Sequence, residues 1–551
     1  MPDQEISSTS QATTGPAKNY VELVGPVHPP HAEPKTRQID ARGVKNRKVA
    51  VLVANGMGSQ VPFETLQLVA NRLRPYAVPL PGAGMDVRVE LVTLGKTQLP
   101  RAEMTVRDQQ GLHVDVHFYE AYWAPLTEGK VTARDGMWFL FMGGLRGLWG
   151  SLMSWRFERW MFRDWQRFPF KSLGLVLAFV LALAVLTSFF VMNVVIVALT
   201  VGRAESPAQF LPLVTADFLP YELGTFALLG LGIGVPMVFR RILAALRWPA
   251  QLGRWMRWPS RLLVFLTIGI TIRTGWKICV AEFEFLRSPQ PPPAPAAHIG
   301  LMVALSLGLA IVIAYAGRWF LREYVGDVAA YVSSYSLSKF DELRNSIQKA
   351  SLGVFQPVYE EESQESKVRR AAAREAKTHP EPEIQFEYEE IVVLGHSLGS
   401  VVAYDTIDAL FNLPSGSTAL DISRRTKAFL TFGSPLDKTA FIFRLQRPRQ
   451  NEIREVLAAA KQPMIQDYAF RPKRWVNLYS PDDWISGSLE FYDPDGVPDP
   501  VTGILALEHT PDPDKRVRNI EDLDAYIPLA AHVFYWTTDT FTRELYEAVV
   551  S

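Results

Sequence analysis

A serine flanked by glycines stands between a buried apolar run and a run typical of a helix. The stretch from Ile391 to Thr406 reads IVVLGHSLGSVVAYDT, so Ser397 is flanked by Gly395 and Gly399. G-x-S-x-G between a strand and a helix is typical of a turn that lifts a serine hydroxyl above the edge of a sheet. The glycines let the chain turn tightly and keep side chains away from the serine. The pattern predicts that Ser397 is a nucleophile.

A serine nucleophile needs a base, and two histidines follow it in the chain. His509 lies in the polar, proline-containing stretch LEHTPDPDK, whereas His532 lies in PLAAHVFYWTTDTF, among small and aromatic residues. A buried histidine beside a helix suits a positioned base better, so we expect His532 in this role. His396, the neighbour of the serine, is expected to point away from the hydroxyl and to pack or hydrogen-bond locally.

The acid that orients the base should follow a late strand. The run RWVNLY at 474–479 predicts such a strand, and SPDDWI follows it directly. An aspartate there can hold the imidazole in the required tautomer and stabilise its charged form. Asp483 is the predicted acid and Asp482 is the near alternative. Asp437, in TFGSPLDK after the preceding strand, is a third candidate.

An oxyanion that develops in the reaction needs two preorganised donors. One is expected to be the backbone N–H of Leu398, directly after the nucleophile. The other should come from the loop after an early strand, which reads NGMG from Asn55. Gly56 and Gly58 would let the backbone approach a substrate, and the N–H of Met57 is the predicted second donor.

Short apolar runs alternate with helix-like stretches outside the middle of the chain. This alternation predicts an α/β fold with a mostly parallel sheet. Helices are expected at 63–73 and 400–411. The charged stretch 356–383 is expected to be a solvated helix or loop. Strands are expected at 48–54, 85–94, 113–119, 390–394, 427–432 and 474–479.

The pieces VLVANGMG, VLGHSLGS, TFGSPL, NLYSPDDWI and AAHVFYW together resemble the α/β-hydrolase superfamily, in particular its lipases and serine esterases. The resemblance covers about 40–130 and 325–551. It implies a Ser397–Asp483–His532 triad that acts through an acyl-enzyme, with no cofactor and no metal. Many lipases have a histidine where this chain has Asn55. This departure from the family pattern affects the expected fine geometry of the loop and not its backbone donors.

The middle of the chain has the composition of a membrane region. About 20 apolar residues span a bilayer, and 172–200 is almost wholly apolar and uncharged. Three weaker runs follow, at 223–239, 262–281 and 299–317, of which 262–281 contains Arg273 and Lys277. The sequence predicts about four spans, with two as the alternative count.

Basic residues orient this region. They gather in 156–171 and 240–261, whereas 201–221 and 281–298 contain one arginine each. By the positive-inside rule, both termini and the flanking domains are expected in the cytoplasm, at the inner or plasma membrane in a bacterium. The arginine- and aromatic-rich stretch 156–171 predicts an interfacial helix.

The predicted organisation has four parts. A disordered segment, 1–46, precedes the first part of the hydrolase domain, 47–130. The interfacial and transmembrane insertion spans 131–322, and the second part of the hydrolase domain, 323–551, carries the nucleophile, acid and base. If both parts form one sheet, the number of membrane crossings between them must be even.

Bulk composition excludes some classes of protein. Lys plus Arg and Asp plus Glu both number 57 in the 551 residues, so nothing indicates a nucleic-acid partner. The single cysteine, Cys279, excludes an internal disulfide and a multi-cysteine metal site. The polar start of the chain predicts no signal peptide.

The predicted function is a membrane-anchored serine hydrolase that cleaves carboxylic esters, with a lipid as the expected substrate. A thioesterase or acyltransferase would use the same residues. A catalytically silent hydrolase fold that serves as a membrane scaffold is the alternative from another class. A transporter with a regulatory soluble part is disfavoured, because few charges lie within the predicted spans.

Overall fold

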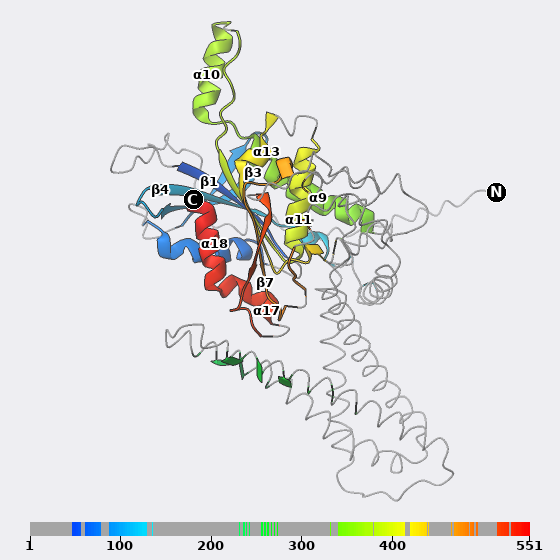
Figure 1. Ribbon diagram of the computed structural model, residues 1–551. Helices are drawn as coiled ribbons and strands as arrows, with labels where there is room; N and C mark the ends of the chain where they lie inside the picture. The colour runs from blue at the N-terminus through cyan, green and yellow to red at the C-terminus, as the bar shows by residue number, and fades with distance from the viewer. Residues whose placement is uncertain are drawn as a thin grey trace, which may run out of the picture.

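The structure is a computed structural model of the 551-residue chain (Figure 1). Apart from isolated positions elsewhere, it describes residues 47–56, 61–78, 87–128, 340–377, 379–413, 419–437, 468–483, 485–489, 492–493, 515–527 and 530–551.

Several predicted features lie outside the described residues. They are the segment 1–46, nearly all of the insertion 131–322 with its four predicted spans, and three site residues or alternatives, Met57, Gly58 and His509. Within the described ranges, no helix combines the length and the apolar character needed to cross a bilayer.

Eight strands form one mixed sheet in the order β2-β3-β4-β1-β5-β6-β7-β8. The β2–β3 and β3–β4 pairs are antiparallel, and every other pair is parallel. The predicted α/β class with a mostly parallel sheet is therefore confirmed. The strands are β1 (Arg47–Ala54), β2 (Arg88–Leu94), β3 (Thr97–Arg107), β4 (His113–Ala121), β5 (Glu390–His396), β6 (Thr426–Phe432), β7 (Trp475–Tyr479) and β8 (Val517–Glu521).

The central strands are buried on both faces, which explains their continuous apolar runs. Along β1, Leu52 faces one hydrophobic core and Val51 and Val53 face the other. Helices α9 (Asp341–Glu360) and α11 (Leu398–Phe411) cover the first face, and α1 (Glu64–Leu73) and α18 (Asp539–Val550) cover the second. Figure 1 shows the sheet between α9 and α11 on one side and α18 on the other.

The carboxyl ends of four neighbouring parallel strands meet at one edge of the sheet. In register, Ala54 of β1 pairs with Gly395 of β5, and the last residues of β5, β6 and β7 follow across the sheet. The loops that leave these strands therefore start side by side. Those loops contain the predicted oxyanion segment, the nucleophile and the candidate acids.

Two strands, β3 and β8, were not predicted from the sequence. β3 contains Pro100, whose ring removes a backbone donor, together with several charged residues. Its pairing with β4 runs only from Ala102 to Arg107, so Pro100 lies beyond that contact and opposes Leu91 of the edge strand β2. A proline is tolerated in such a place. β8 is short, contains three polar or charged residues among its five, and forms the opposite edge of the sheet.

The stretch 356–383, expected to be a solvated helix or loop, belongs to two helices that differ in burial. α9 continues to Glu360 and packs in the core, whereas α10 (Gln364–Glu375) projects away from the sheet (Figure 1). The buried Arg425 holds the base of this projection, because its guanidinium donates to the backbone carbonyls of Tyr359, Leu420 and Tyr388 at 2.7–3.0 Å.

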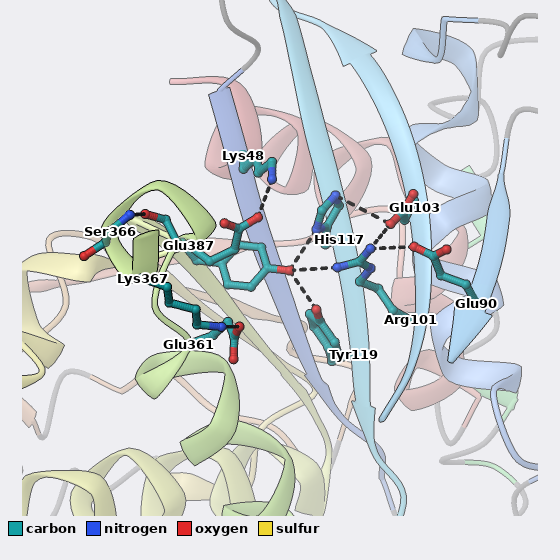
Figure 2. A network of polar contacts seen from close by, with 12 residues as sticks. Lys48, Glu90, Arg101, Glu103, His117, Tyr119, Glu361, Ser366, Lys367 and Glu387 are labelled. Atoms are coloured by element: carbon teal, nitrogen blue, oxygen red, sulfur yellow. Dashed lines mark hydrogen bonds and ion pairs between the residues drawn. The ribbon is translucent and has the colours of Figure 1, made fainter. Parts of the chain in front are cut away.

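A buried polar network joins the outer strands to the segment that precedes β5 (Figure 2). The Tyr388 hydroxyl lies 2.8 Å from Nδ1 of His117 and 2.7 Å from the Tyr119 hydroxyl, both on β4. Arg101 of β3 lies 3.4 Å from the same oxygen. Arg101 also pairs with two carboxylates of the outermost strands, those of Glu90 and Glu103.

The stability of the folded protein should depend on the ionisation of Glu120, on β4. Burial raises the pKa of Glu120 from 4.5 to about 7, because it disfavours the charged carboxylate. The folded protein then binds this proton more tightly than the unfolded chain, so stability is lost as pH rises between these values.

Glu120→Gln removes that loss. We expect its stabilising effect to be larger at pH 8 than at pH 5, by about 2 kcal/mol. Thermal unfolding of the full-length protein at both pH values measures the effect, with the exposed Glu128→Gln as the control. An equal effect of Glu120→Gln at the two pH values would contradict the prediction.

Candidate active site

Ser397 occupies a strained turn between β5 and α11. Its φ is 54° and its ψ is −132°, a conformation that costs a non-glycine residue on the order of 1–3 kcal/mol. The Ser397 N–H donates to the carbonyl of Phe432 at 3.1 Å, and the Ser400 hydroxyl donates to the Ser397 carbonyl at 2.6 Å. Neighbouring strands and the first turn of α11 therefore hold the turn in place.

Gly395 and Gly399 allow this turn because no side chain would fit at either position. A Cβ on Gly395 would lie under 3.0 Å from the backbone of Ser400. A Cβ on Gly399 would lie equally close to the carbonyl oxygens of Ala54 and Asn55 at the end of β1. The start of α11 is thus pressed against the strand that leads into the predicted oxyanion loop.

A chain of hydrogen bonds connects Ser397, His532 and Asp483. His532 Nε2 lies 2.8 Å from the Ser397 Oγ, and His532 Nδ1 lies 2.9 Å from Asp483 Oδ2. All three side chains are buried, with Asp483 only 2% exposed. The structure brings these three predicted residues together from the turn after β5, the loop after β7, and α17 (Ala531–Phe534).

Asp483 is the anionic end of this chain. Burial by itself raises its pKa, but the charge of His532 and several hydrogen bonds outweigh burial and hold the pKa well below its ordinary value. The ionised carboxylate accepts the Nδ1 proton of His532. In the neutral imidazole with its proton on Nδ1, Nε2 can accept the Ser397 hydroxyl proton. The arrangement can activate Ser397 as a nucleophile.

The imidazole of His532 bonds neither of the other two candidate acids. Asp482 is buried, and its backbone N–H is bonded to the Ser480 hydroxyl at 3.1 Å. The Asp437 carboxylate packs against the backbone of Gly487, in the acid loop, so closely that a Cβ on Gly487 would overlap it. Of the three, only Asp483 is bonded to the imidazole.

His396 packs as expected, but its hydrogen bond is not local. Its Nε2 donates to the backbone carbonyl of His532 at 2.9 Å, over a separation of 136 residues. The two imidazole rings lie 5.0 Å apart between centroids. Burial, together with the charge of His532, lowers the pKa of His396 to about 3, so it remains a neutral donor. His396 therefore helps to place the segment that carries His532.

The described part of the oxyanion region is consistent with the predicted first donor. Leu398 is the first residue of α11, where helix N–H groups have no acceptor within the helix. Gly56 is buried at the end of the described loop, and Met57 and Gly58 lie beyond it. Trp123 bonds Asn55 twice: its backbone N–H lies 3.4 Å from the side-chain Oδ1, and its indole donates to the backbone carbonyl at 3.0 Å. The side-chain Nδ2 of Asn55 is buried with no hydrogen-bond partner among the described residues.

One further side chain bonds the acid, a second side chain bonds the first, and neither was predicted. The Tyr535 hydroxyl donates to Asp483 Oδ2 at 3.1 Å, and the Ser486 hydroxyl lies 2.9 Å from that of Tyr535. The available sequence signal was the spacing of His532 and Tyr535, which puts both on one face of a helical turn. That signal is weak, because an aromatic residue at this spacing usually fills a core.

No group of three or more His, Cys, Asp and Glu side chains in the described ranges is arranged to hold a metal ion. Comparisons with protein-family models, curated proteins and solved structures found no match to this chain.

Substituting Gly399 should disrupt the contact between α11 and β1. We expect Gly399→Ala to destabilise the folded protein by about 2–3 kcal/mol, because the added Cβ overlaps two backbone carbonyls. Gly353→Ala is the matched control, since Gly353 is exposed on α9 with nothing within 4 Å of an added Cβ.

The control should stabilise by about 0.5–1 kcal/mol, through helix propensity alone. Thermal unfolding of the full-length variants measures both effects. Equal unfolding midpoints for the two variants would show that the close approach at Gly399 is unimportant.

Proposed function

We propose that this protein is a membrane-anchored serine hydrolase of the α/β-hydrolase type that cleaves carboxylic esters, with lipid esters as its substrate class. The observation that carries the proposal is the bonded chain Ser397–His532–Asp483. It lies on a strained strand-to-helix turn at the carboxyl edge of a parallel sheet, where such a fold exposes its nucleophile.

The first half of the reaction forms an acyl-enzyme. His532 Nε2 takes the Ser397 proton as Oγ attacks the ester carbonyl, and Asp483 stabilises the imidazolium that results. The backbone N–H of Leu398, with a second N–H from the loop after β1, stabilises the tetrahedral oxyanion. The C–O bond of the ester then breaks, and His532 gives its proton to the leaving alcohol.

The second half releases the acid. His532 Nε2 takes a proton from water, whose oxygen attacks the acyl carbonyl. The bond from the acyl carbon to Ser397 Oγ breaks, and the imidazolium returns its proton to the serine. The net reaction is an ester and water giving an alcohol and a carboxylic acid. A thioesterase or acyltransferase would differ only in the leaving group or the acceptor.

The membrane part of the proposal rests on the sequence, and the pairing of the strands limits the number of crossings it can have. The apolar run 172–200 and the three weaker runs lie between β4 and β5 in the chain. β1 pairs directly with β4 on one side and β5 on the other, so both flanks of the insertion belong to one sheet. An even number of crossings satisfies that constraint, and four crossings would leave the site on the cytoplasmic side.

A serine-directed fluorophosphonate probe tests the proposed function in membranes that contain the full-length protein. We expect wild type to be labelled and Ser397→Ala to be unlabelled. His532→Ala should lower the labelling rate about 10³-fold or more, because it removes the base. The controls Ser346→Ala and His113→Ala change a serine and a histidine outside the bonded chain and should label like wild type.

Absence of wild-type labelling would count against an enzyme and favour a silent hydrolase fold that acts as a scaffold. Undiminished labelling of Ser397→Ala would remove Ser397 from the role of nucleophile.

A second prediction concerns the choice between adjacent aspartates. Asp483→Asn should slow labelling about 10⁴-fold, because an amide at this position favours the wrong tautomer of His532. Asp482→Asn should change the rate less than about 10-fold, since its side chain is not bonded to the imidazole. Rate constants for both variants with the same probe decide the assignment, and the reverse order of effects would make Asp482 the acid.

A further inference from the structure

The acid of the proposed triad is itself bonded by a buried phenol. Asp483 Oδ2 accepts from His532 Nδ1 at 2.9 Å and from the Tyr535 hydroxyl at 3.1 Å. The other oxygen, Oδ1, accepts from the backbone N–H of Ile485 at 2.9 Å. Two donors therefore share Oδ2 and a third bonds Oδ1, so both carboxylate oxygens are held.

Tyr535 is fixed in place by packing as well as by its hydroxyl. Its side chain is fully buried, and its ring lies 6.4 Å from that of Phe432 in an edge-to-face arrangement at the end of β6. It follows His532 by three residues, across α17 and the 3₁₀ turn η11 (Tyr535–Thr537). One short segment thus supplies both the base and a donor to the acid.

The hydroxyl proton of Tyr535 is directed to Asp483 by the groups around it. Burial, and then the charge of Asp483, raises the pKa of Tyr535 well above its ordinary value, so the phenol keeps its proton. That single proton points to Asp483. The Ser486 hydroxyl, 2.9 Å from the phenol oxygen, must then be the donor in the Ser486–Tyr535 bond.

We propose that Tyr535 is a positioning residue that acts on His532 through Asp483. By donating to the same oxygen that accepts the imidazole N–H, it fixes the carboxylate rotamer and withdraws charge from Oδ2. The carboxylate then holds an imidazolium less tightly, so His532 is available as a base at lower pH. The proposal rests on the proposed function, because it describes how that triad is tuned.

Other ionisable groups around the pair do not account for this effect. His396, from β5, faces the His532 ring but stays neutral across the working range of pH. Asp522, after β8, is buried and acts on Tyr535 through its charge. Asp482, beside the acid, and Asp437, after β6, are both buried, and neither is bonded to the imidazole.

The test is the pH dependence of the fluorophosphonate labelling rate constant, measured on the full-length protein in membranes. Tyr535→Phe keeps the ring and removes the hydroxyl. We expect the midpoint of its acid limb to rise by about 0.5–1 pH unit, because the less neutralised carboxylate retains the imidazolium to higher pH. On the alkaline plateau, the rate constant should stay within about 10-fold of wild type.

The matched control is Tyr546→Phe. Tyr546 donates to the carbonyl of Arg107 from α18, away from the site, so its variant should keep the wild-type midpoint. Ser486→Ala is the second variant, and it should raise the midpoint in the same direction by a smaller amount. It keeps the proposal testable if Tyr535→Phe does not fold.

The outcomes separate the two proposals. Wild-type labelling at Ser397, with an unshifted acid limb in folded Tyr535→Phe or in Ser486→Ala, would overturn the role of Tyr535 and leave the hydrolase standing. No labelling of wild type at any pH would overturn the hydrolase and, with it, the tuning of its triad. A fall in thermal stability without a shift in the midpoint would make Tyr535 a purely structural residue.

Discussion

The candidate site depends on how closely the start of α11 approaches the end of β1. Gly399 lies against the carbonyls of Ala54 and Asn55 with no room for a side chain. This contact puts the first N–H of the helix beside the loop that leaves β1, and it holds Ser397 at a positive φ. Local strain of this kind persists only where the surroundings over-determine it. Here β5 is paired on both sides, with β1 and β6, so the sheet supports the turn.

Much of the fold could be predicted because the central strands are buried on both faces. β1 and β5 contain the continuous apolar runs VAVLVA and IVVL, because parallel strands in the middle of a sheet are buried on both faces. The outer part was harder. β3 contains Pro100 and charges that argue against a strand, and only its position relative to β4 makes them acceptable. Whether such a segment forms a strand depends on its contacts with distant segments, and these contacts cannot be seen in the local sequence pattern.

The same limit applies to the site. The order of Ser397, Asp483 and His532 along the chain followed from the motif and from the strand ends, but neighbouring residues of a loop point in different directions. Only the folded loop distinguishes Asp483, bonded to the imidazole, from Asp482. The bond from His396 to the His532 carbonyl joins residues 136 apart, and the aromatic character of Tyr535 equally suited a core position. Both act through long-range contacts that the sequence does not display.

The central place of β1 has a consequence for how the protein is made. β1 to β4 leave the ribosome first, yet one edge of β1 pairs only with β5, which follows some 270 residues after the end of β4. At roughly 5–20 residues per second, a nascent chain waits on the order of tens of seconds for that partner. During this time the half-sheet presents an unpaired apolar edge, the kind of surface that invites aggregation. Until β5 emerges, β1 has no partner on that side, so this edge is where the nascent half-sheet is most open to non-native pairing.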